Sequence, residues 1–197
     1  MDQSAYLNTV LGKYGGTFDI EKDRVIDGRQ YAAYAYFSSL GEKYVLVKKA
    51  KLWSVKAYEH TFFLMEDCLT PRLLGELMKS VTDYMEPVLV RKGEKYPEKD
   101  HMYTYLTFVI LCRQTPDETA KKAIRSFRFD KGYLFSMRGH SEARLVVADM
   151  EKEQIFTNGA GRSLGKMYRK AFAETARGAK GYNELFAPEE FRPESPV

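Results

Sequence analysis

The most apolar stretch of the chain lies at residues 102–113 and is rich in β-branched and aromatic residues. Within it, Val109, Ile110 and Leu111 would place large apolar side chains on both faces of an extended chain. A strand that is covered on both faces lies in the middle of a sheet rather than at its edge. We therefore predict a central strand here, around which the rest of the fold is organised.

Alternating apolar and polar positions on both sides of this strand predict two groups of three strands. The predicted strands span residues 29–38, 43–55 and 58–66 before it, and 133–138, 142–149 and 154–157 after it. Consecutive strands joined by short polar connections pair as antiparallel meanders. The predicted fold class is α+β, with a mainly antiparallel sheet made of the two three-strand meanders plus the central strand, and with helices packed on it.

Two helices are predicted before the central strand from apolar residues at helical spacing. The first spans residues 3–14. The second begins at Thr70-Pro71, because threonine can cap the free amide groups of a first turn and proline has no amide hydrogen to leave unpaired there. Its apolar stripe continues to Met85, and we expect this helix to end by Pro87.

Two more helices are predicted after the central strand. One runs to Arg128 and is expected to be capped by Thr115, with Glu118 at the spacing of a capping box. The other covers about residues 163–177 and begins after a run of small residues. Each predicted meander is therefore flanked by a helix on both sides.

The element order α-βββ-α occurs twice, in residues 1–90 and in residues 115–178. A duplication and a coincidence of common element types both remain open, because no residue-level repeat accompanies the order. We expect residues 1–187 to form a single domain. Residues 188–197, which carry prolines among acidic residues, are expected to form an irregular tail.

The composition of the 197 residues supports a packed core, with 44% hydrophobic and 14% aromatic residues. Unbroken apolar runs are too short to span a bilayer, and the first residues lack the pattern of a secretory signal. The two cysteines, Cys68 and Cys112, suit a compartment that keeps thiols reduced. We therefore predict a cytoplasmic protein with no membrane segment.

Basic residues gather in the second half of the chain. The formal net charge is +4, whereas residues 101–180 hold 15 lysines and arginines against 8 aspartates and glutamates. The outer sides of the two later helices are therefore a candidate surface for an acidic partner, either a nucleic acid or an acidic protein. The candidate residues are Lys121, Lys122, Arg125, Arg128, Lys166, Arg169 and Lys170. Ordinary solvated helix faces give the same pattern and remain the simpler interpretation.

A glycine-rich loop before the last predicted helix is a candidate anion site. Backbone amides at the start of a helix can hold an anion, and an arginine adds a positive charge. The candidate residues are Gly159, Gly161, Arg162 and Ser163. The loop has neither the spacing of a dinucleotide-binding fingerprint nor the ending of a P-loop. A turn that lets helix and sheet pack closely explains the loop better.

One predicted turn combines a histidine with a hydroxyl, a carboxylate and arginines, so an active site would most reasonably lie there. The residues of this candidate polar turn are Arg138, His140, Glu142 and Arg144. An ordinary polar hairpin gives the same composition. The histidines and cysteines of the chain match no zinc-binding spacing. No metal, cofactor or catalytic residue is therefore assigned, and an enzyme is disfavoured.

The first predicted block and the central strand have the element order αβββαβ, which resembles the restriction-endonuclease-like core. That family binds a divalent metal with an acid on the second strand and a Glu/Asp-x-Lys on the third. Here the predicted second strand, residues 43–55, has no acid, and the third carries Glu59-x-Thr61 without a lysine. The resemblance is one of element order alone, and it implies at most a degenerate fold without catalytic residues.

Tyrosines and lysines interleave between residues 31 and 58. Aromatic rings that stack on bases beside cations that contact phosphates form a surface for single-stranded nucleic acid. Lys48 and Lys49 project to opposite faces of an extended chain, so the cations do not share one plane. An aromatic core with a charged rim therefore explains this pattern better.

Two segments, Lys43–Trp53 and Arg125–Arg162, resemble parts of a small bacterial protein family known only as a domain of unknown function. The resemblance implies a stand-alone cytoplasmic bacterial protein and supplies no activity. Our first hypothesis is a non-enzymatic binding protein with a basic face for an acidic partner. The alternatives are a small-ligand or anion-binding protein or enzyme that uses the 138–144 turn or the 159–165 loop, and a homo-oligomeric structural protein.

Overall fold

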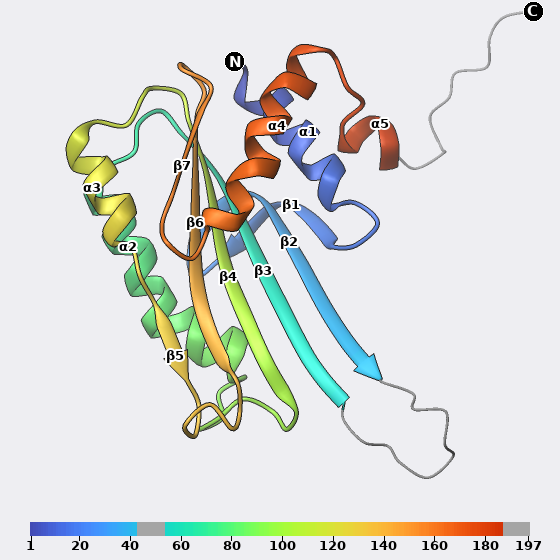
Figure 1. Cartoon of the computed structure of the whole chain (residues 1–197), viewed down its shortest axis with the longest axis vertical. Coiled ribbons are helices and arrows are strands. Elements are labelled where there is room, and N and C mark those ends of the chain that lie inside the picture. Colours follow the sequence, from blue (N-terminus) through green and yellow to red (C-terminus); the bar gives the residue numbers. More distant parts are fainter. Residues whose placement is uncertain (43–53, 187–197) are drawn as a thin grey trace, which may run out of the picture.

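One mixed β-sheet with helices on both faces organises the computed structural model, which describes residues 1–42 and 54–186 (Figure 1). Its strands are β1 (Asp19–Ile26), β2 (Arg29–Glu42), β3 (Ser54–Glu66), β4 (His101–Cys112), β5 (Asp130–Gly132), β6 (His140–Asp149) and β7 (Gln154–Thr157). The helices are α1 (Gln3–Tyr14), α2 (Pro71–Ser80), α3 (Glu118–Ser126), α4 (Gly165–Ala176) and α5 (Tyr182–Phe186). A π-helix, η1 (Val81–Val90), follows α2, and a 3-10 turn, η2 (Arg162–Leu164), precedes α4.

The predicted central strand is confirmed as β4. It lies between β3 and β6, and every residue from Leu106 to Cys112 is buried. Its even-numbered residues face α2, η1 and α3, whereas Val109 and Leu111 face α1 and α4. Both faces of this strand are therefore covered, as its apolar sequence requires.

The α+β class is confirmed, but the prediction of a mainly antiparallel sheet is wrong. β3, β4 and β6 run parallel to one another, whereas β1, β2 and β3 form an antiparallel meander and β6 pairs antiparallel with β5 and β7. The chain passes from β3 to β4 through α2 and η1, and from β4 to β6 through α3. A helical crossover brings the chain back to the end where the previous strand began, so the next strand runs parallel.

The strands of the first meander are displaced from their predicted positions. No strand was predicted in residues 17–28, but β1 occupies most of them and pairs with β2. β1 is an edge strand in which only Ile26 is buried, so it lacks the apolar alternation that marks a half-buried strand. Most of the strand predicted at 43–55 lies outside the described residues, and β3 joins its end to the strand predicted at 58–66.

The strand predicted at 133–138 is also wrong. Leu134, Phe135 and Ser136 have positive φ values of 48°, 53° and 65°, which place them in a left-handed turn that no strand contains. The strand that precedes this turn is the short β5. β5 and β7 then share the free edge of β6, β5 at its beginning and β7 at its end.

The helices agree closely with their predicted positions, with two corrections. α1 covers the predicted residues 3–14, and α4 falls within 163–177. The second helix continues past Pro87 as η1, a π-helix whose wider bonds include the one from Arg91 N–H to Glu86 O. α3 is capped by the Asp117 carboxylate, which accepts from Ala120 N–H at 2.7 Å, and not by Thr115. None of the described helices combines the length and apolarity needed to cross a membrane.

The cap of α2 provides a direct test of how this helix begins. Thr70 Oγ1 accepts a hydrogen bond from Leu73 N–H at 3.2 Å, and Pro71 occupies the first turn. We expect Thr70→Ala to lower the free energy of unfolding by about 1 kcal/mol, because one amide at the helix start loses its acceptor. Thr70→Ser is the matched control and should retain most of the stability in urea unfolding. Equal losses in both variants would contradict the capping role.

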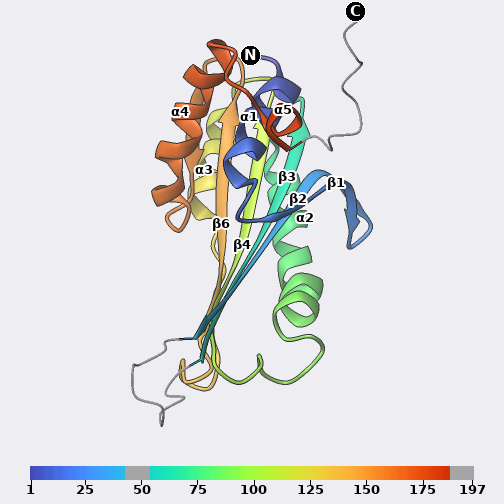
Figure 2. The same ribbon diagram turned by 90° about the vertical axis from the view of Figure 1, so that its right-hand side faces the viewer.

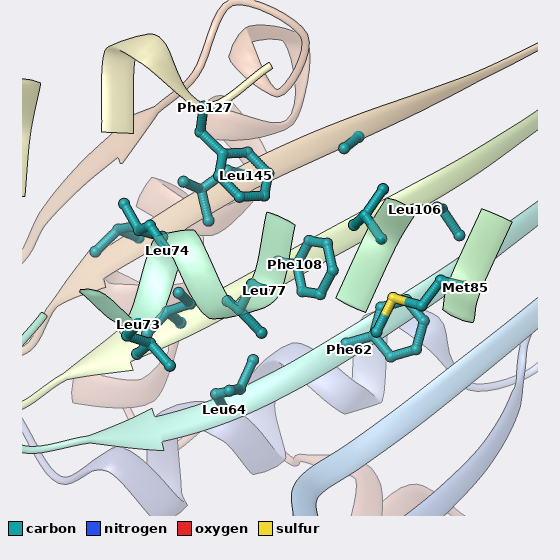
Figure 3. Packing of buried hydrophobic residues seen from close by; sticks show 14 of the residues in the cluster. Phe62, Leu64, Leu73, Leu74, Leu77, Met85, Leu106, Phe108, Phe127 and Leu145 are labelled. Carbon is teal, nitrogen blue, oxygen red and sulfur yellow. The ribbon is translucent and has the colours of Figure 1, made fainter. Parts of the chain in front are cut away.

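The two faces of the sheet carry separate apolar clusters. Figure 3 shows Phe62, Phe108 and Leu145 of the sheet packed against Leu77 and Met85 of α2 and η1. On the opposite face α1 and α4 cover the other cluster. Figures 1 and 2 show that these two helices cover only one half of their face, and that no described helix covers the half toward the start of β4.

Candidate functional site

The four basic residues predicted on the third helix lie on or just after α3. They are Lys121, Lys122, Arg125 and Arg128. Lys121 is half-buried: its Nζ pairs with Glu118 at 2.8 Å and lies 5.5 Å from the centre of the Phe156 ring on β7. The other three are exposed and make no ion pair within the described residues. Three cations of this helix are therefore uncompensated at close range.

The three basic residues predicted on the last helix lie on the exposed side of α4. They are Lys166, Arg169 and Lys170. Lys170 pairs with Glu174 at 3.4 Å, whereas Lys166 and Arg169 have no ion-pair partner in the part of the chain that the structure describes. The Arg169 guanidinium lies beside Gly165 in the first turn of α4. The exposed Arg162 of η2 adds a further unpaired cation next to this turn.

α3 and α4 lie on opposite faces of the sheet, and the edge strand β7 contacts both (Figure 1). On the α3 side Lys121 covers Phe156, and on the α4 side Gly165 lies next to Thr157. The unpaired cations of both helices therefore flank one edge of the sheet. We call this surface the basic rim; it consists of Lys122, Arg125, Arg128, Arg162, Lys166 and Arg169.

The predicted anion loop is held by internal hydrogen bonds. Gly161 is buried, whereas Gly159, Arg162 and Ser163 are exposed. The Gly161 amide donates to Asn158 Oδ1 at 2.8 Å, and the Arg162 amide donates to Gly159 O at 3.4 Å. Two of the amides that would hold an anion are thus already occupied, and the arginine side chain contributes to the basic rim instead.

Asn158, which is only 2% exposed, fills a gap in the edge of the sheet. Between the segments of β6 that pair with β5 and β7, its Oδ1 accepts from Leu145 N–H at 2.9 Å and its Nδ2 donates to Ala143 O at 3.0 Å. The same side chain also bonds Gly161 N–H and, at 2.9 Å, Phe127 O. Its amide therefore replaces a strand and ties β6 to the ends of α3 and η2.

The structure separates one residue of the predicted polar turn from the other three. Arg138 donates to Pro97 O at 3.4 Å, and its carbonyl lies 2.9 Å from His101 Nδ1. His140, Glu142 and Arg144 instead lie at alternate positions of β6, on the face that carries α1 and α4. These three are half-buried in the half of the face that no described helix covers.

Two tyrosines of β4 complete this surface. The Tyr103 and Tyr105 rings stack with their centres 4.4 Å apart, and the Arg144 guanidinium carbon lies 3.1 Å from the centre of the Tyr105 ring. His140 lies 6.3 Å from both rings. We call Tyr103, Tyr105 and Arg144 the stacked platform. Sequence reasoning missed the tyrosines because it assigned their strand to the core, although Tyr-x-Tyr-x-Thr marks one face of β4 as less apolar than the other.

Two carboxylates flank the platform. Glu59 Oε2 lies 3.9 Å from Arg144 Nη1, and Glu142 Oε2 lies 3.9 Å from Arg144 Nε, so neither distance is that of a hydrogen bond. Glu59 is oriented by Thr107 Oγ1, which donates to Oε1 at 2.7 Å. Arg144 Nε is buried without a hydrogen-bond partner. Stacking and charge therefore hold the guanidinium, and it makes no hydrogen bond with residues 1–42 or 54–186.

The face of the sheet that carries α2 and η1 holds a polar network of a different kind. Glu86 is 2% exposed and accepts from Arg91 at 2.7 Å, from Lys131 at 3.0 Å and from Tyr133 at 2.9 Å. Burial opposes ionisation of Glu86, but these hydrogen bonds outweigh it and hold its pKa below the usual value. Every partner is satisfied, which is typical of a structural network.

The histidines and cysteines of the described segments do not gather into a zinc-type site. Among the described residues no group of three or more histidine, cysteine, aspartate or glutamate side chains is placed to hold a metal. Cys68 is exposed, and burial raises the pKa of the Cys112 thiol to about 12. His60 is buried beside Tyr34, and His101 bonds Thr104 at 2.8 Å.

The two strands that would carry the metal ligands of an endonuclease-like core have no carboxylates at paired positions within the described residues. The second strand of that core is β2, because β1 precedes it, and residues 43–53 lie outside the described part. The register places Phe37 opposite Glu59 and Ala35 opposite Thr61. The positions of β2 that face Glu59 and Thr61 thus offer no carboxylate to share a metal.

A hollow of about 300 Å³ lies away from these surfaces, between the β1–β2 turn and α2. Its polar lining groups bond one another: Arg29 pairs with Glu76 at 2.8 Å, and Ser80 donates to Asp27 at 2.5 Å. A ligand would have to displace both interactions, so this hollow offers less than the platform.

Comparisons with known proteins identify a family for this chain. Neither the curated proteins nor the solved structures gave a match. A family model described as a domain of unknown function, DUF8052, matches residues 2–170, which include the basic rim and the stacked platform. The chain therefore belongs to this family of proteins, DUF8052.

Proposed function

We propose that this chain is a non-enzymatic binding protein whose basic rim holds the phosphate backbone of a nucleic acid. One observation carries the proposal: six cations without an ion-pair partner among the described residues flank a single edge strand from both faces of the sheet. Surface cations on one helix are commonplace, but two helices that place them on both sides of the same edge strand concentrate positive charge there.

Nucleic acid fits this surface better than an acidic protein does. Four of the six rim residues are arginines, which bind phosphate with two donors at once. Partly exposed aromatic rings also lie on the adjoining sheet face, where they could contact bases. The two free cysteines support placing the protein in a reducing bacterial cytoplasm, where RNA and DNA are accessible.

The test is a filter-binding or gel-shift measurement with RNA and single-stranded DNA at increasing salt. Arg125→Glu/Arg169→Glu, with one reversal on each helix, should weaken binding at least about tenfold at low salt. The slope of log affinity against log salt should fall by about 0.7 for each phosphate that the variant no longer neutralises, because fewer counterions are released.

Lys95→Glu/Lys99→Glu is the matched control, since it changes the charge equally in the exposed loop before β4, far from the rim. This variant should bind nearly as well as the unmodified protein. No retention of RNA or DNA by the unmodified protein at low salt, or equal losses in both variants, would refute the proposal.

A further inference from the structure

The stacked platform is a row of planar groups on a part of the sheet that no described helix covers. Tyr103, Tyr105 and Arg144 follow one another at stacking distance, and all three are partly exposed. Figures 1 and 2 show that α1 and α4 end before this part of the face. Such a stack has free faces only at its ends, and a planar ligand can extend it there, because every heteroaromatic ring can stack on a flat π-system.

Arg144 has donors for which the described part of the chain provides no acceptor. Its side chain is 14% exposed, yet the described residues provide no hydrogen-bond acceptor for it, and both nearby carboxylates stand 3.9 Å away. Arg91, on the opposite face, shows the usual arrangement, with its Nε bonded to Glu86 at 2.7 Å. A half-buried guanidinium without acceptors is costly unless something else supplies them.

The carboxylates beside Arg144 define what the ligand must offer. Glu142 accepts no hydrogen bond from the described residues, and Glu59 accepts from threonine hydroxyls alone. With one arginine and two glutamates the local charge is negative, so a phosphate is disfavoured at this point. The site therefore requires a planar, uncharged group with donors for a carboxylate and acceptors for a guanidinium.

We propose that the stacked platform binds a guanine base of a single-stranded nucleic acid, an inference that rests on the function proposed for the basic rim. Guanine carries two adjacent donors, N1–H and the N2 amino group, that match the two oxygens of a carboxylate such as Glu142. Its O6 and N7 are two adjacent acceptors that match an arginine such as Arg144. A base must be unstacked from its neighbours to lie on the platform, which requires a single strand.

The register of the sheet places the platform next to the rim. Val146 follows Arg144 on the same face of β6 and pairs with Thr157, which lies next to Gly165 in the first turn of α4. Two residues along a strand span about 7 Å. A nucleic-acid strand whose phosphates contact Arg162, Lys166 and Arg169 therefore passes within reach of the platform.

The experiment uses fluorescence anisotropy with labelled 12-nucleotide pyrimidine strands that carry guanine, adenine or an abasic site at one central position. The unmodified protein should bind the guanine strand about 5- to 100-fold more tightly than the abasic strand, with adenine in between, because stacking and hydrogen bonds add to phosphate binding. Tyr103→Ala and the milder Glu142→Gln should reduce this preference while leaving the salt slope unchanged. Tyr96→Ala, a half-buried tyrosine in the loop before β4, is the control and should retain it.

The outcomes separate the two proposals. Equal, salt-dependent binding of all three strands would overturn the guanine site and leave the basic rim intact. No binding of any strand would overturn the proposed function itself. Free guanosine should bind much more weakly than the guanine strand, and equally tight binding of guanosine would show a nucleoside site and overturn the single-strand inference. Thermal unfolding of each variant identifies losses that come from misfolding.

Discussion

Replacing Asn158 by alanine is expected to lower the free energy of unfolding by about 4 kcal/mol. The substitution removes four hydrogen bonds and leaves two amides and two carbonyls of the protein without partners in a buried position. Each buried group left unpaired costs about 1–3 kcal/mol, and a water molecule can recover part of the loss. Chemical denaturation with a two-state fit measures the effect.

Two further variants define the cause of this loss. Asn158→Asp keeps the side-chain shape but replaces the amino group, so an oxygen would face the Phe127 and Ala143 carbonyls; we expect at least the same destabilisation. Gln154→Ala, at the exposed first residue of β7, the strand that ends just before Asn158, should change stability by less than about 0.5 kcal/mol. A stable Asn158→Ala protein would mean that backbone pairing alone closes the edge of the sheet.

Acidification from pH 7 to pH 4 is expected to remove about 3 kcal/mol of stability through His60 alone. Burial, with a smaller contribution from Lys92, lowers the pKa of His60 from 6.5 to about 4. The unfolded chain therefore binds a proton below pH 6.5 that the folded protein does not bind, and stability falls until the pH reaches the folded pKa. The difference in pKa, converted at about 1.4 kcal/mol for each unit, gives this magnitude.

His60→Gln removes the titrating ring and should show a correspondingly flatter loss of stability between pH 7 and pH 4. Tyr34→Phe removes only the hydroxyl that lies 2.6 Å from His60 Nδ1, so the ring stays buried and the acid sensitivity should persist. Parallel pH profiles for the unmodified protein and His60→Gln would show that the imidazole is protonated in the folded state.

Local patterns in the sequence were sufficient to place several elements. The apolar run at Val109–Leu111 correctly indicated the centre of the sheet, because only a strand covered on both faces tolerates it. Thr70-Pro71 correctly marked the start of α2, since capping depends on neighbouring residues alone. Features that depend on a few adjacent residues were therefore predictable.

Features that depend on long-range pairing were not predictable in the same way. β1 is a polar edge strand whose only support is its hydrogen bonding to β2, so no apolar alternation reveals it. The parallel direction of β3, β4 and β6 follows from the helical crossovers that connect them, whereas the meander rule considers only short connections. Asp117 rather than Thr115 caps α3, since Asp117 directly precedes the helix, and the Thr115 amide is bonded instead to Glu151, 36 residues away.

The candidate site shows the same division. Helical periodicity found the cations of α3 and α4, but only the fold brings them to the two sides of β7. The predicted polar turn included Glu142 and Arg144, whereas Tyr105 and Glu59 reach them from other strands. Which residues lie side by side on adjacent strands depends on the strand register. The hydrophobic pattern of the sequence specifies that register only for the face that packs in the core.

The gap that Asn158 fills also bears on behaviour at high concentration. At this edge of the sheet a second molecule would find only two short strands, β5 with three residues and β7 with four. An amide side chain lies between them. Too few backbone groups are aligned there to template a strand from a second copy. The short, interrupted edge therefore disfavours the addition of strands from further copies, which is the step by which fibrils form.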